Sequence, residues 1–91
     1  MMKNRIILGS LALDLQRAAI GYYQGSDKIA ARFYGEAIER INELDNQSIK
    51  PYLRKHIQSV INLKNQKDIR KKAEDALMYS TIVQNYCLKY C

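Results

Sequence analysis

Residues 68–90 form the longest helix that the sequence predicts. Small or apolar residues recur along this stretch at steps of three or four, namely Ile69, Ala73, Ala76, Ser80, Val83, Cys87 and Tyr90. This spacing places them on one face of a helix that is roughly 35 Å long, at about 1.5 Å per residue. A lone helix with one apolar face is not stable in water, so the preceding segments must pack against this face.

Three earlier segments show the same helical periodicity and are expected to supply that cover. The apolar spacing predicts helices over residues 4–24, 27–44 and 51–63. We expect the buried face of the first helix to consist of Leu8, Leu11, Leu15, Ala18, Ala19 and Tyr22. Asp14 and Arg17 are expected to point away from that face.

Turn and capping residues separate the four predicted helices. Gly25 can adopt the left-handed conformation that ends a helix, and Ser26 or Asp27 can cap the next one. Residues 45–48 form a polar connection, and Pro51 is tolerated only in the first turn of a helix. The apolar phase breaks between residues 63 and 68, where Asn65 is expected to cap the last helix.

These elements predict a single all-α domain over residues 1–91, an antiparallel up-and-down four-helix bundle with a long C-terminal helix. The last helix is about ten residues longer than the third, so its end is expected to project past Pro51. Such an overhang would leave an apolar, tyrosine-rich face uncovered. The expected interface residues are Tyr79, Val83, Tyr86 and Tyr90 with Ile6 and Ile7 of the first helix. They would bind a partner helix or close a homodimer, which makes the leading interpretation a non-enzymatic interaction module or adaptor.

The net charge of +6 lies entirely in the second half of the chain. A positive field favours acidic partners, so the alternative interpretation is a nucleic-acid-binding protein. Its expected anion-binding residues are Lys64, Lys67, Arg70, Lys71 and Lys72, helped by Lys50, Arg54 and Lys55. The same lysines and arginines are also compatible with a solvated loop. An immunity-type or antitoxin-like protein is a third interpretation, since small basic helical bundles serve there too.

Chemistry-bearing patterns are absent from the sequence. His56 has no partner at metal-ligand spacing, and Cys87 has no second base, so we expect no metal, no cofactor, no small-molecule substrate and no enzymatic activity. No segment approaches the roughly 20 apolar residues of a membrane span, so stable membrane insertion is not expected. Cys87 and Cys91 are four residues apart, which is too far for an unstrained disulfide on one helix, and a cytoplasmic location is the default.

The second predicted helix carries a family resemblance. The stretch Lys28-Ile-Ala-Ala-Arg-Phe-Tyr-Gly-Glu-Ala-Ile-Glu39, with Ala18 and Gly25 upstream, resembles the opening hairpin of the microtubule-interacting-and-transport (MIT) domain and, more loosely, a tetratricopeptide unit. Leu53, Arg54, Ile57, Val60 and Ile61 are similar to the start of the third MIT helix. The resemblance implies a peptide-binding adaptor with no chemistry of its own.

Overall fold

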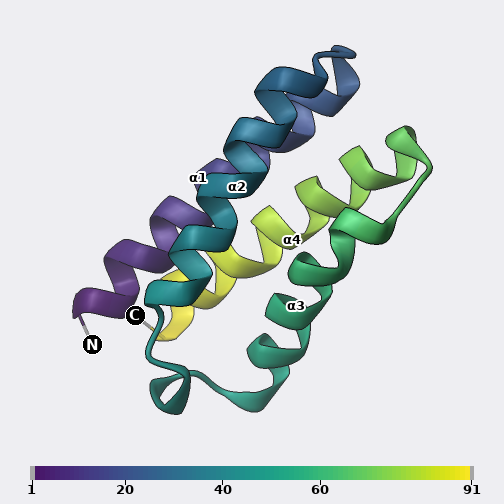
Figure 1. The fold of residues 1–91 in the computed structure, drawn as a ribbon. Helices are drawn as coiled ribbons and strands as arrows, with labels where there is room; N and C mark the ends of the chain where they lie inside the picture. The colour runs from purple at the N-terminus through teal and green to yellow at the C-terminus, as the bar shows by residue number, and fades with distance from the viewer. Residues whose placement is uncertain (1, 91) are drawn as a thin grey trace.

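A computed structural model describes residues 2–90 of the chain, and over this range the fold is all-α (Figure 1). The helices are α1 (Met2–Tyr23), α2 (Asp27–Glu43), α3 (Pro51–Asn62) and α4 (Ile69–Tyr90), with short 3-10 turns at Asn46–Ser48 and Leu63–Asn65. They run alternately up and down, and α1 and α4 lie antiparallel to each other. The predicted four-helix bundle and its long C-terminal helix are confirmed, since α4 has 22 residues and α3 has 12.

Local chemistry explains where the helices begin and end. Gly25 has φ +73°, the conformation that glycine adopts most easily, and the Ser26 hydroxyl accepts a hydrogen bond from the Ile29 N–H at the start of α2. The expected cap of the last helix at Asn65 is wrong. Asp68 caps α4 instead, because its carboxylate accepts hydrogen bonds from the N–H groups of Arg70 and Lys71.

Helix α1 packs closely against both α2 and α4 because small residues line both contacts. On the α2 side, a Cβ built on Gly21 would lie only 2.8 Å from the backbone nitrogen of Ala30. On the α4 side, the Ser80 hydroxyl donates a 2.7 Å hydrogen bond to the Ala12 carbonyl. Small residues let helix backbones approach one another, so α1 is the central element of the bundle.

The core contains the predicted buried face of α1 in full, and large side chains from α3 and α4 complete it. The largest fully buried side chains are Leu8, Leu11, Leu15, Leu53, Val60 and Val83. The prediction that Asp14 points away from the core is wrong, because its side chain is buried. Since α1 has neighbours on two sides, its buried face is wider than the single face that the periodicity indicated.

The connection between α2 and α3 is also more than a polar link. Leu44 and Ile49 at its two ends are buried in the main core, beside Tyr86. The buried Asn4 side chain holds the connection to α1, because its amide donates to the Asp45 carbonyl and accepts from the Asp45 N–H. This connection therefore folds over the end of α4.

Candidate functional site

The tyrosine-rich end of α4 does not form the uncovered overhang that the sequence predicted. Tyr86 is only 5% exposed, and Val83 and Ile7 are buried as well. The Tyr86 hydroxyl accepts a 3.0 Å hydrogen bond from the backbone N–H of Lys50. These three predicted interface residues belong to the core of the protomer, because the connection that carries Ile49 covers the end of the long helix.

The other predicted interface residues are more accessible, but neighbouring side chains cover some of them in part. Tyr90 packs against Tyr86 with ring centroids 4.9 Å apart, and the ammonium group of Lys50 lies 4.8 Å from the centroid of the Tyr90 ring. Tyr79 is half-buried and lies beside the ring of His56. Ile6 is exposed. The aromatic rings of α3 and α4 thus pack mainly on one another.

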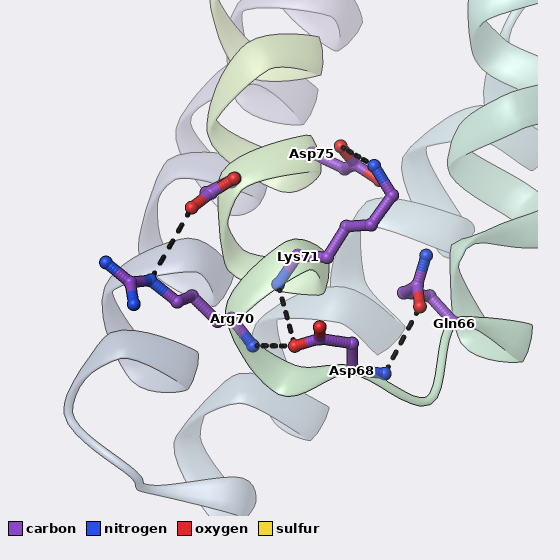
Figure 2. Close-up of polar contacts among 6 residues, drawn as sticks. Gln66, Asp68, Arg70, Lys71 and Asp75 are labelled. Atoms are coloured by element: carbon purple, nitrogen blue, oxygen red, sulfur yellow. Dashed lines mark hydrogen bonds and ion pairs between the residues drawn. The ribbon is translucent and has the colours of Figure 1, made fainter.

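The basic turn between α3 and α4 is largely engaged within the chain (Figure 2). The Arg70 guanidinium lies 3.7 Å from the carboxylate of Glu74, and the Lys71 ammonium lies 3.9 Å from that of Asp75. The Lys72 ammonium lies 5.2 Å from the centroid of the Tyr22 ring. Because Asp68 already accepts from two N–H groups at the start of α4, the helix N-terminus offers less to an external anion.

The eight predicted anion-binding residues are divided between two ends of the molecule. Lys64, Lys67, Arg70, Lys71 and Lys72 lie at the turn after α3. Lys50, Arg54 and Lys55 lie at the start of α3, about 18 Å away along a 12-residue helix. The structure therefore does not bring all eight into one patch.

Sequence reasoning missed another surface, formed by exposed sides of α1 and α4 and bordered at Ile6 by Asn42 and Glu43 of α2. We define the α1/α4 face as Ile6, Gly9, Leu13, Gln16 and Ile20 of α1 with Leu77, Thr81, Gln84 and Leu88 of α4. All nine are exposed, and five of them are large apolar side chains. None of the nine carries a charge.

A shallow groove runs along this face between the two helices. Gly9, Leu13 and Gln16 line it from α1, while Gln84, Cys87 and Leu88 line it from α4. Leu77 and Thr81 line an adjoining hollow with Met78. Gly9 contributes no side chain, which helps keep the groove open.

A sequence signal for this face existed. Ile6, Leu13 and Ile20 are spaced seven residues apart, and Leu77, Thr81, Gln84 and Leu88 follow at steps of four, three and four. Both patterns are those of a helix face that packs on other helices. They were hidden because α1 and α4 each carry a second, more apolar stripe that forms the core of the bundle.

The buried Asp14 carboxylate has a pKa that departs clearly from its ordinary value. Burial raises its pKa above the ordinary value, and the nearby Glu36 carboxylate raises it further, while Arg40 and Arg17 act in the opposite direction. The Arg40 Nε atom lies 3.9 Å from the carboxylate, which is a loose ion pair. Asp14 is enclosed between helices and not open to a substrate.

Among residues 2–90, no three His, Cys, Asp or Glu side chains are grouped so that they would hold a metal ion. Cys87 is a free thiol, and its possible partner Cys91 lies outside the described residues. None of the helices in this range is both long enough and apolar enough to cross a membrane.

No family model, curated protein or solved structure matches the chain. The resemblance to MIT domains and tetratricopeptide units therefore stays a prediction.

Proposed function

We propose that this protein is a non-enzymatic helical interaction module, and that it binds another helical protein surface through the α1/α4 face. The observation that carries the proposal is the composition of α1. This helix is apolar on the side that faces the core and also along Ile6, Leu13 and Ile20 on the opposite side. A second apolar stripe on the exposed side of a helix is typical of a surface that packs on a partner.

The energetics of the face support binding of an apolar partner. Fully burying a Leu or Ile side chain is worth about 1.5–3 kcal/mol, so the exposed part of each is worth on the order of 1 kcal/mol. Leu13, Ile20 and Leu77 are 41–46% exposed, and Leu88 is 80% exposed. None of the nine residues is charged, so no charge among them has to be desolvated, and only Gln16, Thr81 and Gln84 carry polar side chains that need hydrogen-bond partners in the contact.

The spacing of the face indicates the shape of the partner. Residues that repeat at steps of three and four present a narrow seam along a helix, and such seams pack best against other helices. The face thus favours a helical partner over an extended peptide or a small molecule. This retains the adaptor function that the sequence predicted and moves it to a different surface.

A comparative pull-down from the native host tests this function. Three baits are compared: the wild type, a double variant with Leu13→Gln and Leu88→Gln, and a control with Ile29→Gln on α2. Ile29 suits as the control because it is 45% exposed and Leu13 is 44% exposed. We expect the wild type and the control to retain the same protein, and the double variant to lose it.

A double variant that keeps every protein retained by the wild type would contradict the proposed function. The same experiment addresses the nucleic-acid alternative. Nucleic acid that is retained by the wild type and lost from a Lys64→Gln, Lys67→Gln variant would favour that alternative instead, because phosphate contacts depend on these charges.

A further inference from the structure

We infer that the partner of the α1/α4 face is a second copy of this chain, so that two protomers pair face to face in a two-fold dimer. This inference rests on the proposed function and names its partner. The α1/α4 face consists of two antiparallel helices of 22 residues each. A second copy presents the same pair, and two such pairs would form an intermolecular four-helix packing.

The charge distribution favours self-association at this face over other faces. Each chain carries a net charge of +6, so two copies repel one another wherever their charged surfaces meet. The nine residues of the face are uncharged. Two copies that meet there place mainly apolar and neutral polar groups in contact, with Glu74 beside Leu77 and Glu43 beside Ile6 as charged neighbours.

An acidic partner would select a different surface. Positive side chains attract carboxylates or phosphates, and eight of the fifteen lie in the stretch from Lys50 to Lys72. The α1/α4 face offers no cation to such a partner. The seam of Ile6, Leu13 and Ile20 is instead complementary to an equal seam, because apolar side chains at heptad spacing interdigitate with others of the same spacing.

A contact along the full length of α1 and α4 is large enough for a stable dimer. The nine residues of the face extend over about 21 Å of α1, at about 1.5 Å per residue. The molecule measures 36 × 20 × 19 Å, so a contact that continues over the full length of α1 and α4 covers at most roughly 36 × 20 Å. That corresponds to on the order of 700 Å² per protomer, close to the ~800 Å² that each partner contributes to a standard interface. A contact confined to one end of the bundle would be much smaller.

Two neutral polar side chains interrupt the apolar lining of the groove. Gln16 of α1 and Gln84 of α4 both line it, at positions where a tighter helical seam would carry leucine. Replacing Gln84 with Leu adds apolar surface without changing charge. The inference therefore predicts a variant that pairs more tightly than the wild type as well as variants that pair more weakly.

Sedimentation equilibrium of the full chain, from 1 to 500 μM in order-of-magnitude steps, tests the inference. We expect the wild type to dimerise, Leu13→Gln with Leu88→Gln to raise the dimer Kd at least about tenfold, and Gln84→Leu to lower it several-fold. Ile29→Gln, which is equally exposed but lies on α2, should leave the Kd unchanged. Circular dichroism at low concentration confirms that each variant is folded.

Two outcomes would overturn the inference. The first is a wild type that remains monomeric throughout this range, and the second is a dimer that the face variants and the Ile29 control affect equally. A monomeric wild type would remove the second copy as the partner and leave the interaction module standing. The module itself fails only if the double variant keeps its partners in the pull-down.

Discussion

The hydroxyl of Tyr34 joins two helices whose backbones hardly approach each other. Its oxygen lies 2.8 Å from the carbonyl oxygens of both Val60 and Ile61 at the C-terminal end of α3, so its single O–H can donate to either one. The Val60 carbonyl also accepts a hydrogen bond from the Leu63 N–H. The Tyr34 hydroxyl therefore links the end of α3 to α2.

Tyr34→Phe removes that hydroxyl and keeps the ring. We expect the free energy of unfolding to fall by about 1 kcal/mol, the usual net worth of a hydrogen bond, because the side-chain link between α2 and the end of α3 is lost. Urea denaturation followed by circular dichroism measures the change. Tyr23→Phe is the matched control, since Tyr23 is exposed, and an equal loss in both variants would contradict the role given to Tyr34.

Asp14 is expected to make stability depend on pH. Burial and Glu36 raise its pKa in the folded state, so the folded chain binds the proton more tightly than the unfolded chain does. Stability should therefore decrease as pH rises from the unfolded value of 3.8 through the raised folded value. Above that window the full cost of the ionised carboxylate remains.

Asp14→Asn removes this cost and keeps the size of the side chain. We expect the variant to be more stable than the wild type at pH 7, with a difference that narrows as the pH is lowered toward 3.8. Urea denaturation at a series of pH values measures this difference. A variant that is less stable at pH 7 would show that the loose pairing with Arg40 outweighs the desolvation of Asp14.

Among the elements, the contact between α1 and α2 depends on one missing side chain. An exposed glycine inside a helix usually costs about 0.5–1 kcal/mol relative to alanine. A Cβ at Gly21 would lie 2.8 Å from the backbone nitrogen of Ala30 and 3.0 Å from its Cα, so α1 and α2 would have to move apart. Gly35 on α2 has open space at the same position.

We expect opposite effects from the same substitution at these two positions. Gly35→Ala should raise the free energy of unfolding by about 0.5–1 kcal/mol, whereas Gly21→Ala should lower it by about 1–3 kcal/mol because the contact is overpacked. Thermal and urea denaturation measure both. If Gly21→Ala also stabilised the protein, the close approach of the two helices would be refuted.

The four helices were predictable from sequence because apolar residues at steps of three and four, together with Gly25 and Pro51, report local structure directly. The packing of these helices on one another was not predictable in the same way. Asp14 is buried only because α1 lies between two neighbours, and Ile49 covers Tyr86 only because the chain folds back over the end of α4. Both depend on contacts between distant segments, which periodicity within one helix does not report.

At the scale of the whole molecule, the predicted uncovered overhang is absent, and an exposed apolar surface lies elsewhere. The sequence indicated an uncovered apolar helix face, but Val83 and Tyr86 are in the core, and the exposed residues lie on α1 and the neighbouring side of α4. Finding these residues required knowing which of the two apolar stripes on each helix faces the core. The packing of α2 and α3 determines which stripe is buried.

Thermal stability is expected to depend on protein concentration and salt if two copies pair through an uncharged face. Association stabilises the folded state by mass action, so the Tm should rise by several degrees, about 4–8 °C per kcal/mol, as the chain is concentrated. Added salt screens the repulsion between two +6 chains and should raise the Tm further. Differential scanning calorimetry measures both effects.

The Leu13→Gln, Leu88→Gln variant provides the control for this measurement. Its Tm should be nearly independent of concentration, because it removes two large side chains from the face. A wild-type Tm that does not rise with protein concentration would contradict the apolar dimer.

The antiparallel contact between α1 and α4 also has a consequence for synthesis in the cell. Ser80 and Ala12, which are joined by a hydrogen bond, are 68 residues apart in the chain. The first helix therefore leaves the ribosome long before its partner is translated, and until then its leucines are accessible to chaperones and to other nascent chains. Slow translation before residue 69 would prolong that vulnerable interval.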